Sequence, residues 1–234
     1  MIRVSLLGST GRMGTQVLEL LHSNEYPELH AAESVSSKTA LNSKLFQSTD
    51  VWIDFSRPQA LLRFLKEMPA SDTPIVTGST GWSSKEWDEL LQYTREHPIF
   101  FASNFSVGIH ILRSIIKENA QLLSQHGFTV SVSETHHVHK VDKPSGTARS
   151  LIEDLRTGYA ATAIAVESIR EGEVIGDHTL SFKSTYEELS FSHHASDRRL
   201  FAAGALHVAQ WIARAGLKRG RLYSMDDFVE AQGA

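Results

Sequence analysis

The densest group of chemically useful side chains lies between Glu134 and Arg149. The segment reads Glu-Thr-His-His-Val-His-Lys-Val-Asp-Lys-Pro-Ser-Gly-Thr-Ala-Arg. Its histidines titrate near neutral pH, and its lysines are cationic donors. The run Pro-Ser-Gly-Thr is typical of a helix start, where free N–H groups bind a carboxylate. These residue types indicate proton transfer to a small anionic substrate, and a dicarboxylate fits them.

Metal binding is an alternative use of His136, His137 and His139, because clustered imidazoles suit zinc or copper. However, adjacent residues of an extended segment point to opposite faces. No carboxylate at ligand spacing joins the histidines, and the nearby lysines would repel a cation. We therefore expect no metal.

A solvated loop is the other alternative for the segment. Surface or packing roles are expected for four further residues: His139, Lys143, His193 and His194.

A glycine-rich turn follows the first apolar run and opens a helical stretch. It consists of Gly8, Ser9, Thr10, Gly11, Arg12, Met13 and Gly14. Glycines allow a tight turn and close approach to a pyrophosphate, and the helix start attracts anions. The spacing is G-x-x-G-x-x-G in place of G-x-G-x-x-G, so the dinucleotide loop is a variant and a plain tight turn remains the alternative. Met13 is expected to pack under the sheet, while Arg12 reaches a phosphate or lies in solvent.

An acidic residue about 20 residues beyond such a loop normally accepts the ribose hydroxyls of the cofactor. Glu33 is the candidate for that role. The hydroxyls and the lysine of the following segment, Ser34 to Lys38, would instead suit a 2′-phosphate, and a solvated loop is equally open. The sequence therefore leaves the choice between NADH and NADPH open.

These residues need elements to position them, and the apolar periodicity predicts two arrangements. In the first part, compact apolar runs alternate with helical stretches, which predicts a doubly wound parallel sheet of Rossmann type. Its strands are expected at Ile2–Leu7, Val51–Phe55, Pro74–Thr77 and Ile99–Ala102, and its helices at Thr15–His22, Ala60–Met68 and Lys85–His97.

After Phe105 the pattern of apolar residues changes, and it predicts a smaller α+β part with a mixed sheet. A helix is expected at Gly108–Ser124, followed by strands at Thr129–Glu134, Ala163–Arg170, His178–Ser184 and Glu188–His193. Arg199–Ala215 is again helical, and the tail Leu222–Phe228 returns to the first part. We therefore expect a dinucleotide-binding domain at 1–107 and 199–234, and a substrate-binding and oligomerisation domain at 108–198.

Composition excludes several classes of protein. The chain has 234 residues, 41% hydrophobic and 21% charged, with a net charge of -4. Nothing in this balance suggests a nucleic acid or an anionic membrane as partner. The sequence has no cysteine, which excludes disulfides, thiolate metal sites and a cysteine nucleophile. No apolar run is long enough for a membrane span or a signal peptide, so a cytoplasmic location is expected.

The pattern H-H-x-x-K-x-D-x-P-S-G-T-A, from His136 to Ala148, resembles the signature of the 4-hydroxy-tetrahydrodipicolinate reductases, also called dihydrodipicolinate reductases. Four further segments look like family segments in family order: Gly8–Gly14, Asp54–Pro58, Thr77–Gly81 and Ala102–Gly108. The resemblance spans most of the chain.

The resemblance implies NAD(P)H-dependent reduction of 4-hydroxy-tetrahydrodipicolinate, via dihydrodipicolinate, to tetrahydrodipicolinate in diaminopimelate and lysine biosynthesis. It implies that His136 and Lys140 donate the proton that follows hydride transfer. The substrate carboxylates would be bound by His137, Lys140, Gly146 and Thr147. The cofactor would be contacted by Ser56, Gly78, Ser79, Thr80, Ser103, Asn104, Phe105 and, from the far domain, Arg198.

The resemblance also implies a homotetramer, assembled through the sheet of the second domain. The chain is shorter than expected for the family, between Glu33 and Asp50 and between Ala148 and Arg198, so cofactor preference and assembly stay open. A non-catalytic cofactor sensor is one alternative, although a sensor has no reason to keep His136, Lys140 and the helix start together. A reductase or dehydrogenase acting on an amino acid semialdehyde or aspartate is another.

Overall fold

The computed structural model describes residues 1–36, 39 and 41–233. The chain forms two compact units. The first unit runs from Met1 to Phe105 and resumes at Arg199, and the second is Ser106–Arg198. The division falls two residues before the boundary expected after residue 107. The functions expected of the two domains stay predictions.

The first unit contains a six-stranded parallel sheet in the order β10-β5-β4-β3-β1-β2. Its strands are β1 (Ile2–Leu7), β2 (Leu29–Val35), β3 (Val51–Asp54), β4 (Ile75–Thr77), β5 (Ile99–Phe101) and β10 (Leu222–Tyr223). Its helices are α1 (Arg12–His22), α2 (Ser43–Gln47), α3 (Pro58–Glu67), α4 (Ser84–Tyr93), α7 (Arg199–Ala215) and α8 (Met225–Gly233). The strand order reverses between β1 and β3, and ligands of such sheets bind beyond the carboxyl ends of the strands at that point.

The central strands are apolar along their whole length because helices cover both faces of the sheet. Val51, Trp52 and Ile53 of β3 are fully buried. Helix α7 contacts α1 and the strands β1, β3 and β4, while α3 and α4 contact each other. This layering confirms the predicted doubly wound fold and fixes the carboxyl ends of β1, β3 and β4 beside one another.

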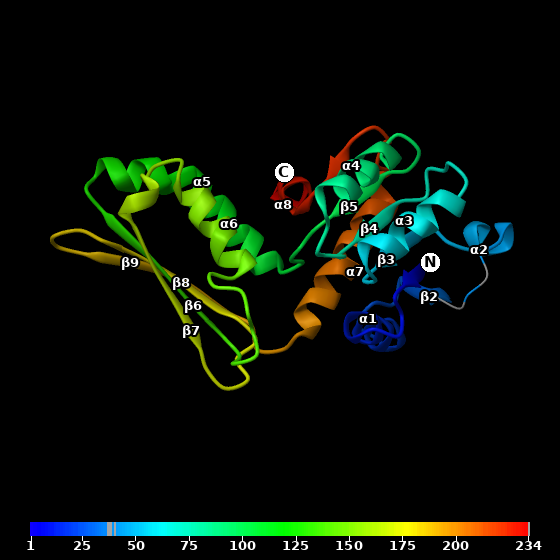
Figure 1. Cartoon of the computed structure of the whole chain (residues 1–234), viewed down its shortest axis with the longest axis horizontal. Coiled ribbons are helices and arrows are strands. Elements are labelled where there is room, and N and C mark those ends of the chain that lie inside the picture. Colours follow the sequence, from blue (N-terminus) through cyan, green and yellow to red (C-terminus); the bar gives the residue numbers. More distant parts are fainter. Residues whose placement is uncertain (37–38, 40, 234) are drawn as a thin grey trace. The chain divides into compact units, whose positions relative to one another are not determined.

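The second unit contains a mixed four-stranded sheet in the order β7-β6-β8-β9. Strand β6 (Thr129–His136) pairs in parallel with β7 (Ile164–Arg170) and antiparallel with β8 (Asp177–Lys183), which pairs with β9 (Glu188–His194). A short 3-10 helix, Ala161–Ala163, precedes β7. Helices α5 (Val107–Gln125) and α6 (Gly146–Leu155) cover one face of the sheet (Figure 1). The core between sheet and helices includes Ile116, Val132, Leu151, Leu180 and Phe182.

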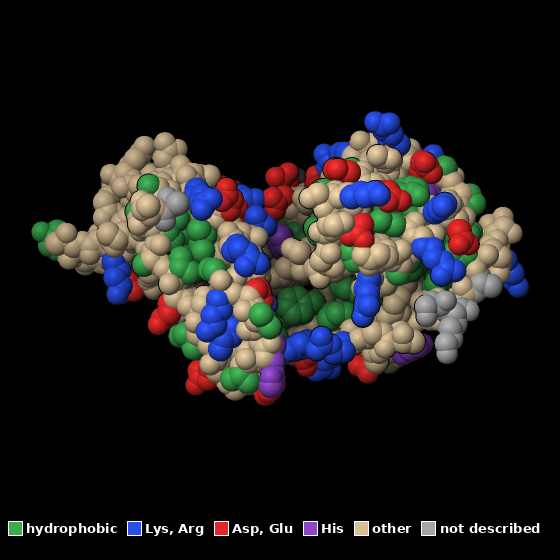
Figure 2. Space-filling model, viewed as in Figure 1, with side chains coloured by type: hydrophobic (Ala, Val, Ile, Leu, Met, Phe, Trp, Pro, Cys, Tyr) green, Lys and Arg blue, Asp and Glu red, His purple; other side chains and the backbone are tan. Residues whose placement is uncertain are grey.

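The predicted helices and strands are present, with ends that differ by a few residues. No bounds were predicted for β2, and neither α2 nor the strand β10 was predicted. None of the helices that the structure describes is both long and apolar enough to cross a membrane. On the face seen in Figure 2, basic and acidic side chains are interspersed, in keeping with a net charge of -4.

Candidate active site

The glycine-rich loop between β1 and α1 has a backbone that only glycine fits. Gly8 has a φ of +77°, and a Cβ there would lie 2.8 Å from the carbonyl carbon of Phe55. A Cβ at Gly14 would lie 2.3 Å from the carbonyl oxygen of Gly8. Helix α1 begins at Arg12 behind Gly11, which has no side chain to cap it. The first-turn N–H groups are thus suited to a phosphate, so the loop fits a dinucleotide.

A pocket of about 550 Å³ lies at the carboxyl ends of β1, β2 and β3. Of the predicted cofactor residues, Gly8, Thr10, Gly11 and Ser56 line it. The predicted residues Ser9, Arg12, Met13 and Gly14 belong to the same loop without lining the pocket. Arg12 is exposed and Met13 is partly buried.

Glu33 is not among the residues that line this pocket. Its carboxylate accepts a hydrogen bond of 3.2 Å from the hydroxyl of Ser48. The charged side chains among the described lining residues are those of Arg57 and Arg63. Ser37 and Lys38, which belong to the segment that would suit a 2′-phosphate, lie outside the described residues. The structure thus does not bring the expected ribose acceptor to the pocket.

Asp54, the last residue of β3, organises two loops and was not predicted as a functional residue. One of its carboxylate oxygens accepts hydrogen bonds from the hydroxyls of Thr77 and Ser79, both at 2.7 Å. The other accepts from the backbone N–H of Ser56 at 3.0 Å and from the Ser56 hydroxyl. Burial of the carboxyl raises the pKa of Asp54, and these hydrogen bonds oppose the rise. Asp54 therefore ties the turn after β3 to the turn after β4.

The turn after β4 contains Gly78, Ser79 and Thr80, three of the predicted cofactor residues. A Cβ at Gly78 would lie 2.3 Å from Cε1 of Phe55 and 3.0 Å from Cε2 of Phe105. The two phenylalanine rings meet edge to face at 5.6 Å. Glycine is therefore required for the turn to lie against these rings. Within this unit, Ser103 is exposed and Asn104 partly buried beside Phe105.

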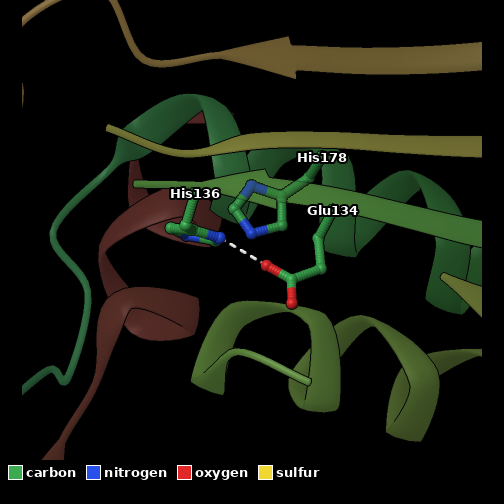
Figure 3. A group of neighbouring side chains, drawn as sticks. All are labelled: Glu134, His136 and His178. Atoms are coloured by element: carbon green, nitrogen blue, oxygen red, sulfur yellow. Dashed lines mark hydrogen bonds and ion pairs between the residues drawn. The ribbon is translucent and has the colours of Figure 1, made fainter. Parts of the chain in front are cut away.

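In the second unit, Glu134 and His136 point to the same face of β6 because they are two residues apart. The carboxylate of Glu134 hydrogen-bonds Nδ1 of His136 (Figure 3). Its other oxygen accepts from Nη2 of Arg170 at 2.9 Å and from the backbone N–H of Ser145 at 3.3 Å. The ring of His178, on β8, lies 5.1 Å from that of His136. The sequence predicted a role for His136 and for the helix start at Ser145, but none for Glu134, Arg170 or His178.

Ser145 caps the start of α6, which begins at Gly146, as the Pro-Ser-Gly-Thr run predicted. Its hydroxyl accepts a hydrogen bond from the N–H of Ala148 at 3.1 Å and lies 3.3 Å from Nε2 of His178. Gly146 is exposed and Thr147 is partly exposed in the first turn of the helix. The start of α6 thus lies next to the histidines and presents backbone to solvent.

Lys140 lies in the loop between β6 and α6. Its ammonium pairs with the carboxylate of Asp142 at 2.8 Å. Nε of Arg170 donates to the Lys140 carbonyl at 3.2 Å, and Nη2 of Arg170 donates to the Asp142 carbonyl. Arg170 therefore anchors this loop to the same Glu134 that holds His136.

Burial and neighbouring charges set the protonation states of the site. Burial lowers the pKa of His136; the Glu134 carboxylate opposes this, while Lys140 and Arg170 add to it. Burial alone would raise the pKa of Glu134, but hydrogen bonds led by that from Arg170 bring it below its usual value. Burial, with the charges of His136 and His193, lowers the pKa of His178 to about 4. At neutral pH, Glu134 is ionised and His178 is neutral.

The positions of these side chains bear on whether the site binds a metal ion. One ligand-type atom from each of Glu134, His136 and His178 lies within 4.8 Å of the others. Glu134, two positions before His136, joins that histidine and His178, a grouping that was not expected; among the described residues, His137 and His139 do not belong to it. Both oxygens of Glu134 are already hydrogen-bonded, one of them by the Arg170 guanidinium. A cation here would meet that positive charge, so we assign no metal.

The remaining candidates are more exposed or lie beside the cluster. His139 and Lys143 are exposed, as predicted. His137, adjacent to His136, is partly exposed, with its ring centroid 6.2 Å from that of His139. Nε2 of His193 lies 3.0 Å from the hydroxyl of Ser106, and the exposed His194 pairs with Asp177. Arg198 is partly exposed at the end of the second unit.

Comparisons with known proteins agree along nearly the whole chain. Residues 2–105 match the family model of the dihydrodipicolinate reductase N-terminus, and residues 108–229 match that of the C-terminus. The chain is 36% identical to the 4-hydroxy-tetrahydrodipicolinate reductase of Bdellovibrio bacteriovorus, over 97% of the chain and 96% of that protein. It is also 36% identical to the enzyme of the same name from Akkermansia muciniphila, over 98% of each.

A solved structure has a similar fold. It is the dipicolinate-bound dihydrodipicolinate reductase of Paenisporosarcina sp. TG-14, with a TM-score of 0.77 and 18% identity. The match covers 97% of this chain and 99% of that one. The two-unit architecture is therefore shared with a reductase of known structure.

Proposed function

The chain belongs to the dihydrodipicolinate reductase family, and from that premise we propose a catalytic cycle in which His136 and Lys140 complete a nicotinamide-dependent reduction. As a member of this family the protein is an NAD(P)H-dependent oxidoreductase of diaminopimelate and lysine biosynthesis. The proposed substrate is 4-hydroxy-tetrahydrodipicolinate, which is reduced via dihydrodipicolinate to tetrahydrodipicolinate. The observation that carries the proposal is the cluster of His136, Lys140 and the start of α6 in one unit.

The proposed reaction has two steps, a hydride transfer followed by the donation of a proton. The nicotinamide, when bound, supplies a hydride to the conjugated imine, which leaves an electron-rich enamine. His136, acting with Lys140, donates the proton that completes the reduction. The cationic Lys140 favours this step because it lowers the pKa of His136 and so makes the protonated ring a stronger acid.

The substrate is a dicarboxylate, and the proposed carboxylate-binding residues are His137, Lys140, Gly146 and Thr147. Support comes from α6, whose exposed first turn offers backbone N–H groups and the positive end of the helix dipole. The dipicolinate bound to the solved relative is likewise a dicarboxylate.

The proposed cofactor residues of the first unit comprise the loop Gly8 to Gly14 with two further groups. Ser56 lines the pocket beside that loop, while Gly78, Ser79 and Thr80 belong to the turn that Asp54 holds. Ser103, Asn104 and Phe105 follow β5. Arg198 and Glu33 stay proposals that rest on the family resemblance and on chain position respectively.

Assembly and location are also proposals. We propose a homotetramer that forms through the sheet of the second unit. Helices α5 and α6 cover one face of this sheet, and Ser131, Ser133, Thr179 and Ser181 on the other face are only partly buried. Light scattering on the purified protein measures the mass directly. The absence of cysteine agrees with a cytoplasmic location.

The first test is oxidation of NADPH and NADH, followed by absorbance, with the substrate generated in place by the preceding synthase. Wild-type protein is expected to turn over, and Lys140→Ala to lose about 100-fold or more, the range of general acid catalysis. Lys143→Ala, which removes an exposed neighbouring lysine, is the matched control and is expected to stay near wild type. A silent wild type that still binds a cofactor would point to a sensor or to another substrate.

A further inference from the structure

Glu134 and Arg170 form a buried ion pair in the second unit, and a stabilising effect alone does not explain it. The side chain of Glu134 is 0% exposed and that of Arg170 is 8% exposed. Burying two charges costs about as much as their attraction returns, so apolar side chains often replace such pairs without loss of stability. Stability alone therefore gives little reason for an ion pair at this position.

We propose that Glu134 and Arg170 are positioning residues that fix the tautomer of His136 and hold the Lys140 loop beside it. The inference rests on the proposed function, because it says how the proton donors named above are oriented. Neither residue has to touch the substrate for this role.

The tautomer follows from the protonation of Glu134. An ionised carboxylate accepts hydrogen bonds and donates none. Since the Arg170 guanidinium and its other partners keep Glu134 ionised, Nδ1 of His136 must carry the hydrogen that the pair shares. Nε2 is then the ring nitrogen that exchanges a proton with the substrate, and the carboxylate stabilises the imidazolium that forms when Nε2 is protonated.

The surroundings of Nε2 are shaped for this role. Gly176, a buried residue of the connection from β7 to β8, lies beside the ring: a Cβ added there would be 3.0 Å from Nε2 of His136. Any larger residue would contact the nitrogen that the proposed chemistry needs. The glycine keeps that nitrogen clear of protein side chains on this side.

Glu134 also connects the histidine to the helix that binds the substrate. The oxygen that accepts from Arg170 accepts from the N–H of Ser145, the cap of α6. The hydroxyl of Ser145 contacts Nε2 of His178, which stays neutral. A single carboxylate thus sets the position of both the proton donor and the carboxylate-binding helix start.

Arg170 also positions the loop that carries Lys140. It donates to the carbonyls of Lys140 and Asp142, the two residues whose side chains pair at 2.8 Å. The guanidinium fork therefore joins the loop that carries Lys140 to the carboxylate that holds His136. Removing the pair is expected to misplace both donors without removing either.

The test is a double variant, Glu134→Gln with Arg170→Met, which removes both buried charges together. Its expected midpoint of thermal unfolding is close to that of the wild type, because no buried charge is left alone. We expect kcat to fall about 10- to 100-fold, the range seen when a partner that orients a metal-binding histidine is lost. KM for the nicotinamide is expected to stay within about twofold, since the cofactor loop is in the other unit.

The matched control is another charged pair of the same unit, Arg113 and Asp154, joined at 2.6 Å between α5 and α6. The double variant Arg113→Met with Asp154→Asn is expected to keep the wild-type kcat. An equal loss of kcat in the two double variants would overturn the proposal, because it would then reflect general disturbance of the unit.

A spectroscopic measurement tests the proposal without turnover. Nitrogen-15 shifts of His136 are expected to show a proton on Nδ1 in the neutral wild-type ring, and the more usual Nε2–H form in the double variant. A wild-type ring protonated on Nε2 would overturn the proposal. If the wild type failed to reduce the substrate but showed the Nδ1–H form, the proposed function would fail while the positioning inference survived.

A single variant covers the case in which the double variant does not fold. Gly176→Ala leaves Glu134 and Arg170 in place and adds one methyl group against Nε2 of His136. Its kcat is expected to fall at least about tenfold, because the methyl group displaces the reacting atoms from their geometry, while the Nδ1–H form is retained. An unchanged kcat would contradict the assignment of Nε2 as the reacting nitrogen.

Discussion

At the scale of the residue, buried carboxylates position the site in each unit. Asp54 joins the turns after β3 and β4, and Glu134 joins β6 to β7 and to the start of α6, since each accepts hydrogen bonds from segments distant in sequence. Such an acceptor is costly to remove because its donors stay buried without partners.

Asp54→Ala is expected to lower the free energy of unfolding by about 2 to 4 kcal/mol, because the hydroxyls of Thr77 and Ser79 lose their acceptor. The affinity for the nicotinamide cofactor should fall with it, since the turn containing Gly78 loses its anchor. Urea unfolding and cofactor fluorescence titration measure the two effects. Asp72→Ala, at an exposed ion pair, is the control and should cost less than about 0.5 kcal/mol. A loss below about 1 kcal/mol for Asp54→Ala would contradict this account.

The sequence predicted part of the residue network. His136, Lys140 and the cap at Ser145 stand in one contiguous motif with recognisable chemistry. Arg170 and His178 reach the site only through the pairing of β6 with β7 and β8, which no local pattern encodes. Glu134 was within reach of sequence reasoning, because two residues along a strand point to the same face.

At the scale of the element, the pocket beside the glycine-rich loop bears on the choice of cofactor. Two arginines line it, Arg57 before α3 and Arg63 within α3, and no carboxylate is among its described lining residues. A ribose 2′-hydroxyl normally meets a carboxylate, whereas a 2′-phosphate meets an arginine. We therefore expect NADPH to bind more tightly than NADH.

Arg63→Ala is expected to weaken binding of 2′,5′-ADP by about tenfold, the effect of losing one charge-assisted hydrogen bond, and to leave 5′-AMP binding nearly unchanged. Titration calorimetry measures both ligands without any hydride transfer. Lys66→Ala, on the same helix but outside the pocket, is the matched control. Equal weakening of both ligands would show that Arg63 does not discriminate between them.

Strands could be predicted from the sequence where nearly all of their residues are buried. β3, β4 and β5 are apolar runs covered on both faces, and their sequences show it. In contrast, β2 is an edge strand of the sheet that buries only its first and last residues, Leu29 and Val35, so its apolar pattern is weak. The five residues of α2 are too few to show helical periodicity.

At the scale of the whole molecule, buried histidines make stability depend on pH. Burial lowers the pKa values of His97, His136, His178 and His193 below that of an exposed histidine. The folded protein therefore binds fewer protons than the unfolded chain at mildly acidic pH. Their contribution is complete above about pH 6.5 and is lost as the pH falls toward the folded values.

We expect the free energy of unfolding to fall between pH 7 and pH 4, with a contribution of up to about 3 kcal/mol from His178, whose folded pKa is about 4. Urea unfolding across this range measures the slope. His97→Phe, which fills the buried position with an uncharged ring, should make the slope shallower. A slope that is flat in the wild type, or unchanged by the substitution, would contradict the assignment to buried histidines.

The division of the first unit into two chain segments has a consequence for synthesis on the ribosome. Helix α7, which packs on β1, β3 and β4, leaves the exit tunnel only after all of Ser106–Arg198 has been made. It must then fit closely, since a Cβ at Gly204 would lie 1.9 Å from the carbonyl oxygen of Phe105. One apolar face of the nascent sheet therefore stays uncovered until α7 has been made. Synthesis of the second unit is complete before that of the first unit. During that interval the uncovered apolar surface makes the growing chain prone to aggregation.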